Sequence, residues 1–179
     1  MINVLIVEDD PMARKLLEIY INDSEEYKLS QSIESAAMAE LYCRRNPIDL
    51  ILMDVCTAMD ANGLDAAAKI KKSCPHIKII IVTSQPEFSF IERARKAGVE
   101  SFWYKSASAE EIIEVMNRTM AGDSVYPDTT PSLRLGEAMN FDFTEKELLV
   151  LRLVVDGEAD ADIAEKLGMS LRTVKAHIQ

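Results

Sequence analysis

Short runs of apolar residues recur along residues 1–122, and each is followed by a turn and an amphipathic stretch. These runs do not alternate with polar positions, which is typical of parallel strands that are covered on both faces. Strands are predicted at Val4–Val7, Tyr27–Ile33, Leu50–Met53, Ile79–Val82 and Phe102–Tyr104. Five strands alternating with five helices predict a doubly wound α/β domain with a five-stranded parallel sheet and right-handed crossovers.

Helix patterns fill the intervals between the predicted strands. The first helix has an apolar face made up of Ala13, Leu16, Leu17 and Tyr20. The last helix of this domain has a face made up of Ile112, Val115, Met116 and Met120. A four-helix bundle fits less well, because the β-branched runs are too short to be helices.

Beyond Gly122 the alternation stops, and prolines with small polar residues predict a linker over 123–143. A helical block follows at 144–179. Its first helix begins with a capping box of Thr144 and Glu147 and carries an apolar stripe made up of Leu148, Leu151 and Val155. Ser170 is predicted to cap the last helix, whose inward side consists of Leu171, Val174 and Ile178. The sequence thus predicts an α/β domain at 1–122 and a small all-α domain at 144–179.

Composition narrows the function classes. A net charge of −10 argues against non-specific nucleic-acid binding by the whole chain. The apolar runs are too short to span a bilayer and the N-terminus lacks a signal peptide, so we expect a cytoplasmic protein with no membrane partner. Cys43, Cys56 and Cys74 show no paired spacing, which favours free thiols over disulfides or zinc.

Charged and hydroxyl side chains follow the predicted strands. Glu8 and Asp9 come after the first strand and Asp54 after the third, so three carboxylates are expected at one sheet edge. Such carboxylates repel one another unless a cation intervenes, and hard oxygen ligands favour Mg²⁺. Thr83 and Lys105 end the fourth and fifth strands. Together these groups supply what phosphoryl transfer to a carboxylate requires; the alternative is a solvated, helix-capping loop.

Residues 1–122 resemble the receiver domains of response regulators, which have a flavodoxin-like fold. The resemblance implies Asp54 as the phosphoacceptor, with Thr83 as the switch hydroxyl and Lys105 as the phosphate-binding cation. It further implies a Mg²⁺ site, with ligands from Glu8, Asp9, Asp54 and the backbone carbonyl of Cys56. Phe102 matches the aromatic residue whose rotation reports phosphorylation. A sensor histidine kinase is the implied partner.

The chain departs from the receiver pattern in three places. The loop from Thr57 to Gly63 lacks a proline and is one residue longer than usual, which affects the flank of the metal site. Ser106 replaces a common cis proline, so we expect a trans bond there. Phe102 has no hydroxyl, so any switch works by packing alone. Cys56 invites a redox role, although a packing role is favoured.

Residues 144–179 resemble the LuxR-type helix-turn-helix of NarL/FixJ-class regulators, with Ser170 to His177 matching the start of a recognition helix. The resemblance and the outer face of that helix point to base contacts by Lys175, Ala176 and Gln179 and phosphate contacts by Arg172 and Thr173. Family members continue beyond this point, so the sequence suggests an incomplete domain with weak or absent specific DNA binding. Glu158, Asp160 and Asp162 add repulsion toward DNA phosphates.

The sequence therefore predicts a phosphorylation-controlled transcription regulator that is not an enzyme. Ile112, Val115 and Met116, with the first helix, are candidates for a homodimer surface, and core packing is the open alternative. A haloacid-dehalogenase-like phosphohydrolase needs an acid two residues after the nucleophile, where this chain has Cys56. A phosphorylation-independent interaction module with the receiver fold is the remaining alternative.

Overall fold

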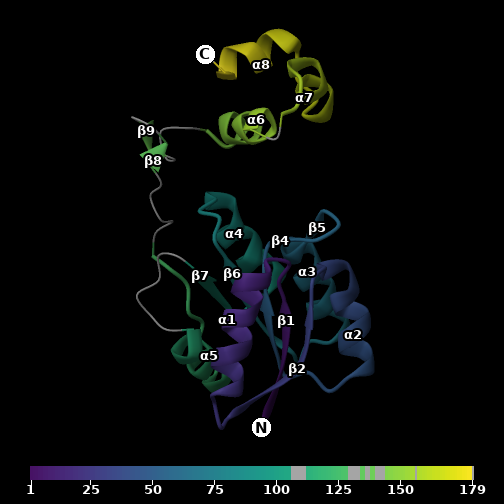
Figure 1. Cartoon of the computed structure of the whole chain (residues 1–179), viewed down its shortest axis with the longest axis vertical. Coiled ribbons are helices and arrows are strands. Elements are labelled where there is room, and N and C mark those ends of the chain that lie inside the picture. The colour runs from purple at the N-terminus through teal and green to yellow at the C-terminus, as the bar shows by residue number, and fades with distance from the viewer. Residues whose placement is uncertain (106–111, 129–133, 136–137, 140–143, 156, 179) are drawn as a thin grey trace. The chain divides into compact units, whose positions relative to one another are not determined.

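A computed structural model describes residues 1–105, 112–128, 134–135, 138–139, 144–155 and 157–178 (Figure 1). The chain divides into two compact units, which are Met1–Pro131 and Ser132–Gln179. The first contains β1 (Ile2–Val7), α1 (Pro11–Asn22), β2 (Tyr27–Ile33), the 3₁₀ helix η1 (Ala36–Met38), α2 (Ala39–Arg45), β3 (Leu50–Met53), β4 (Cys56–Thr57), β5 (Ala61–Asn62), α3 (Gly63–Ser73), β6 (Lys78–Thr83), α4 (Phe88–Ala97), β7 (Ser101–Tyr104) and α5 (Ile112–Ala121).

Five strands form one parallel sheet in the order β2-β1-β3-β6-β7. All five predicted strands and the doubly wound fold are confirmed. The chain places β2 on one side of β1 and β3 on the other, so the strand order reverses between β1 and β3. In open α/β sheets such a reversal leaves a crevice at the carboxyl ends of the two strands.

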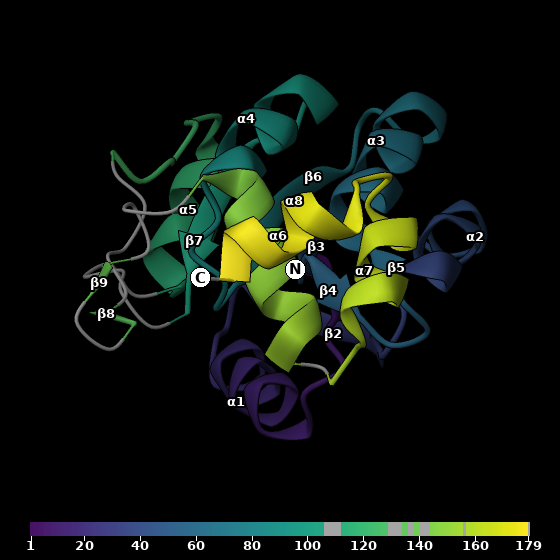
Figure 2. The same cartoon turned by 90° about the horizontal axis from the view of Figure 1, so that it is seen from above.

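Side chains that alternate along the strands build a core on each face of the sheet. On one face α1 and α5 cover a cluster that includes Val4, Ile6 and Ile80, and on the other α2, α3 and α4 cover Leu5, Ile51 and Ile79 (Figure 2). These strand residues are no more than 1% exposed. Burial on both faces explains why the strands read as continuous apolar runs.

One helix face differs from the prediction, and burial on a second helix decides between two alternatives. On α1 the buried residues are Leu17 and Ile21, whereas Leu16 is 48% and Tyr20 41% exposed. On α5 the proposed dimer-surface residues, Ile112, Val115 and Met116, are buried against the sheet. Core packing, the alternative that the sequence left open, therefore holds for these three residues, because the sheet needs that face of α5 to complete its core.

The second unit contains β8 (Arg134–Leu135), β9 (Ala138–Met139), α6 (Glu145–Val155), α7 (Asp160–Lys166) and α8 (Leu171–Ile178). The small core of the three helices consists of Val150, Ile163, Ala164 and Val174. The predicted capping box is confirmed, since the Glu147 amide donates to Thr144 Oγ1 (3.3 Å) and the Thr144 amide donates to Glu147 Oε2 (2.7 Å).

The predicted apolar faces of this unit are only partly confirmed. Val155 is 84% exposed, Leu171 45% and Ile178 38%, so these three do not pack inward as expected. Leu151 is half-buried, and the side chain of Leu148 lies outside the described part of the structure. Among the helices in the described ranges, none combines the length and apolar character needed to cross a membrane.

Candidate functional site

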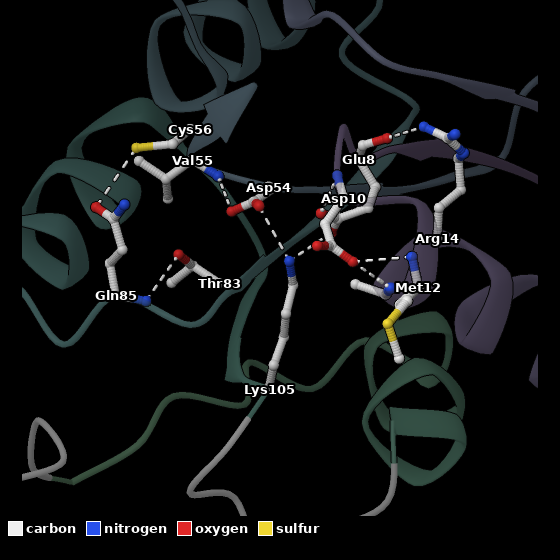
Figure 3. Close-up of polar contacts among 11 residues, drawn as sticks. Glu8, Asp10, Met12, Arg14, Asp54, Val55, Cys56, Thr83, Gln85 and Lys105 are labelled. Atoms are coloured by element: carbon white, nitrogen blue, oxygen red, sulfur yellow. Dashed lines mark hydrogen bonds and ion pairs between the residues drawn. The ribbon is translucent and has the colours of Figure 1, made fainter. Parts of the chain in front are cut away.

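Three carboxylates meet where β1 and β3 end, and Figure 3 shows two of them, Glu8 and Asp54. Val7 and Met53 are register partners, so the residues that follow them, Glu8 and Asp54, leave the sheet side by side. One oxygen from each of Glu8, Asp9 and Asp54 lies within 4.8 Å of the others. Glu8 is 1% and Asp54 8% exposed, whereas Asp9 is exposed. The cluster is thus buried at its base and open to solvent through Asp9.

Lys105, directly after β7, reaches across this cluster. Its ammonium group donates to Glu8 Oε2 at 2.5 Å and to Asp54 Oδ2 at 3.0 Å (Figure 3). Burial raises the pKa of Glu8 to about 7 despite the opposing effect of Lys105, and the negative charge of Asp54 adds to the rise. Burial alone would lower the pKa of Lys105, but its two carboxylate partners outweigh burial and raise it. The lysine therefore remains a cation.

Further contacts fix the backbone around the cluster. The Val55 amide donates to Asp54 Oδ1 at 2.6 Å, which orients the carboxylate. Arg14 on α1 donates to the carbonyl oxygen of Glu8 at 2.8 Å and pairs with Glu34 at 3.2 Å. Asp10 accepts from the amides of Met12 and Ala13, so this acid caps α1. The helix-capping alternative therefore holds for Asp10.

The longer loop after Asp54 forms a small hairpin of β4 and β5. Met59 and Asp60 at its tip adopt left-handed backbone conformations, with φ of 66° and 52°. The buried Thr57 hydroxyl accepts from the Ala36 amide at 2.9 Å and donates to the Ala61 carbonyl at 2.7 Å. Asn62 then caps α3. The extra residue is absorbed in the turn, and α3 still begins beside the backbone of Asp54.

Thr83 is 1% exposed at the end of β6, and its hydroxyl accepts from the Gln85 amide at 3.2 Å. The Cys56 thiol donates to Gln85 Oε1 at 3.4 Å, so Gln85 links the start of β4 to the end of β6 (Figure 3). Phe102 is 2% exposed, with its ring centroid 4.9 Å from that of Tyr104. The roles of Thr83, Phe102 and the Cys56 carbonyl stay predictions, and Ser106 lies outside the described residues.

The predicted DNA-contacting residues lie on α8. Its one buried residue is Val174, and Arg172, Thr173, Lys175 and Ala176 are all exposed. Gln179 lies outside the described residues. Before α7, Glu158 forms an ion pair with Lys166, which offsets part of the acidic charge in this region. Within this unit, these four α8 residues are thus exposed, as the sequence predicted for the outer face of a recognition helix.

Sequence reasoning missed two residues that build the site and the contact made by a third. Arg14 gives no signal of its own, because the neighbouring Lys15 on the same helix is also basic. Gln85 gives none, because its partners come from β4 and β6. Gly63 was noticed for its spacing alone, whereas the structure places it against the backbone of Asp54.

Two family models match the sequence: the response regulator receiver domain over residues 4–117 and bacterial regulatory proteins of the luxR family over residues 142–179. The chain is 31% identical over 182 residues to the response regulator protein VraR of Staphylococcus aureus and of Staphylococcus epidermidis. That alignment covers 99% of this chain and 87% of VraR.

Solved structures share the fold. RcsB dimers bound to two parallel DNAs align with a TM-score of 0.65 at 18% identity, covering 98% of this chain and 87% of RcsB. A luxR-family two-component response regulator from Aurantimonas sp. aligns with a TM-score of 0.64 at 22% identity, covering 72% of this chain and 89% of that one.

The parallel sheet with its carboxylate and lysine cluster defines a receiver domain, followed in the chain by a luxR-type DNA-binding domain. The chain belongs to the response regulator family.

Proposed function

We propose that the chain is a phosphorylation-controlled transcription regulator whose Asp54 accepts a phosphoryl group from the phosphohistidine of a sensor histidine kinase. The observation that carries the proposal is the cluster of Glu8, Asp9 and Asp54 with Lys105 bound at its centre. A carboxylate nucleophile and a buried cation for the phosphoryl oxygens are the groups that such a transfer needs.

In the transfer, an Asp54 carboxylate oxygen forms a bond to phosphorus as the phosphorus–nitrogen bond of the donor breaks. The donor imidazole leaves with the electrons of the broken bond, and it departs as the neutral base because its other ring nitrogen already carries a proton. Lys105 neutralises charge on the phosphoryl oxygens, and the Val55 amide keeps the acceptor oriented. The chain is thus a switch and does not turn over a substrate.

The site fits a Mg²⁺ ion. Glu8, Asp9 and Asp54 offer clustered oxygens, one of them exposed to solvent, and the Cys56 carbonyl is the expected further ligand. A few carboxylate oxygens, with water and phosphate oxygens of the phosphodonor completing the coordination shell, are typical ligands of Mg²⁺. When bound, the ion would supply positive charge against the incoming phosphoryl group.

The output is DNA binding through the exposed face of α8. Arg172, Thr173, Lys175, Ala176 and Gln179 are the proposed contacts. The match of residues 142–179 to the luxR family and the likeness of the fold to RcsB, which was solved bound to DNA, support this output. Phosphorylation would control this domain by shifting the population between two arrangements. Homodimer formation would use the exposed side of α1, where Leu16 and Tyr20 lie.

Intact mass measured after incubation with Mg²⁺ and acetyl phosphate tests the proposal. We expect the wild type to gain one phosphoryl group and Asp54→Asn to gain none. No gain in the wild type, with Mg²⁺ binding also undetectable, would overturn the proposal and favour a phosphorylation-independent interaction module.

A further inference from the structure

The segment that follows α5 turns back and lies along β7, at the edge of the sheet. The Phe102 amide donates to the Val125 carbonyl at 2.8 Å, and the Val125 amide donates to Ser101 Oγ at 3.0 Å. Val125 packs against the core on one face of the sheet and Tyr126 against the core on the other. The two residues thus lie against β7, the edge strand of the sheet, although they come from the start of the predicted linker.

A buried hydroxyl chain fixes this attachment. Thr119 Oγ1 donates to the Val115 carbonyl at 2.6 Å, so the 2.7 Å contact between the two hydroxyls requires Ser101 to donate to Thr119. Ser101 Oγ is then left to accept from Val125. Both hydroxyl residues are 0% exposed. Each donor in this series of three hydrogen bonds thus has one acceptor, so the two hydroxyl groups can adopt only one orientation.

The side chain of Tyr126 adds a second set of contacts between this segment and the sheet. Its hydroxyl donates to the Val99 carbonyl at 2.8 Å, and the Arg95 guanidinium lies 3.9 Å from its ring centroid. The ring centroid of Phe102 is 6.3 Å from that of Tyr126. Burial raises the pKa of Tyr126 to about 12, so its hydroxyl remains a donor at neutral pH. The Arg95 cation on α4, the Val99 carbonyl in the following loop and the Phe102 ring on β7 therefore hold one linker residue.

β7 connects this attachment to the phosphoacceptor site. Lys105, at the end of β7, binds Asp54 and Glu8, while Ser101 and Phe102 on the same strand hold Val125 and Tyr126. We infer that Tyr126 is a positioning residue that anchors the linker to β7 and Phe102, so that phosphorylation of Asp54 loosens the linker. The inference rests on the proposed function, because it takes Asp54 as the phosphoacceptor.

These contacts indicate why phosphorylation should loosen the linker rather than tighten it. Val125 and Tyr126 contact β7 in the position that it has while Lys105 pairs with Glu8 and Asp54. A phosphoryl group on Asp54 would draw Lys105 toward its own oxygens. Any shift of β7 or Phe102 then weakens the contacts made by Val125 and Tyr126. Coupling is reciprocal, so a chain without the anchor is phosphorylated to a greater extent.

Amide hydrogen exchange of the full chain tests the inference, with intact mass recorded on the same samples. In the wild type, phosphorylation should raise the exchange rate of the Phe102 amide roughly tenfold. Tyr126→Ala should raise it without phosphorylation, Arg95→Gln to a smaller extent, and Leu41→Ala, at an exposed leucine of α2, should leave it unchanged.

A phosphorylated wild type that exchanges Phe102 at the unmodified rate would overturn the inference, as would a folded Tyr126→Ala chain with wild-type exchange. A wild type that gains no phosphoryl mass would contradict the proposed function instead. The comparison of Tyr126→Ala with the wild type still tests the anchor in that case.

Discussion

Gly63 and Asp54 approach each other so closely that a Cβ atom on Gly63 would stand 1.9 Å from the carbonyl oxygen of Asp54. The Gly63 amide also donates to the neighbouring Val55 carbonyl at 2.8 Å. The first residue of α3 therefore packs directly against the backbone of the acceptor, and only glycine leaves room for it. Although the hairpin before α3 departs from the receiver pattern, this contact keeps the acceptor in place.

Gly63→Ala should reduce phosphorylation of Asp54, because the added methyl group forces α3 and the acceptor backbone apart. Such overpacking costs about 1–3 kcal/mol of unfolding free energy. Urea unfolding and the rate of phosphoryl gain are the measurements. Gly98→Ala is the control: this glycine has a φ of 78° with open space around it, so that variant loses stability without losing phosphorylation. Equal rates for Gly63→Ala and the wild type would contradict the account.

Lys105→Met should destabilise the chain by roughly 3–5 kcal/mol, because it leaves two buried carboxylates without their cation. Added Mg²⁺ should restore part of this loss by binding the same carboxylates. Lys71→Met is the matched control, since Lys71 pairs with Glu100 at 2.6 Å and has a similarly buried side chain. Thermal unfolding with and without Mg²⁺ compares the two, and an equal response to Mg²⁺ in both would argue against the metal site.

Thr144→Ala should lower the stability of the second unit by about 1 kcal/mol, since it removes the hydroxyl that caps α6. Circular dichroism during thermal unfolding reports the helical unit. Glu147→Gln retains the reciprocal bond to the Thr144 amide and should have a smaller effect. If Thr144→Ala unfolds like the wild type, the capping box contributes nothing to this domain.

Alkylation should distinguish the three cysteines. Burial raises the pKa of Cys43 to about 12, so almost none of this thiol is thiolate between pH 7 and 9 and it should be alkylated slowly across that range. Cys74 is also buried, whereas Cys56 is half-buried and should be labelled first. Peptide mass analysis after iodoacetamide treatment reads each site, with the urea-unfolded chain as control. Labelling of Cys43 in the folded chain at the unfolded rate would contradict its burial.

The sheet was predictable because its strands are buried on both faces and therefore read as apolar runs in the sequence. The same rule placed Glu8, Asp54, Thr83 and Lys105 at strand ends, and parallel pairing then brings those ends to one edge. The site residues that follow a strand were thus accessible to sequence reasoning. Their distances, and the bond from Lys105 to both acids, depend on packing.

Helix faces were less predictable. Helix α1 has apolar residues on more than one side, and the pattern alone does not show that Leu17 and Ile21, rather than Leu16 and Tyr20, meet the sheet. The exposure of Leu171 and Ile178 depends on which helices surround α8. Tyr126 was assigned to the linker because its partners, Arg95, Val99 and Phe102, are distant in sequence.

The central claim is that Asp54 is the phosphoacceptor, and borohydride trapping tests it most directly. Borohydride reduces an acyl phosphate to an alcohol, so tandem mass spectrometry of peptides locates the modified carboxyl group. After incubation with Mg²⁺ and acetyl phosphate, we predict reduction at Asp54 alone, and none when Mg²⁺ is chelated. Reduction at Glu8, Asp9 or another carboxylate, or an unmodified Asp54 in a folded and Mg²⁺-loaded chain, would contradict the claim.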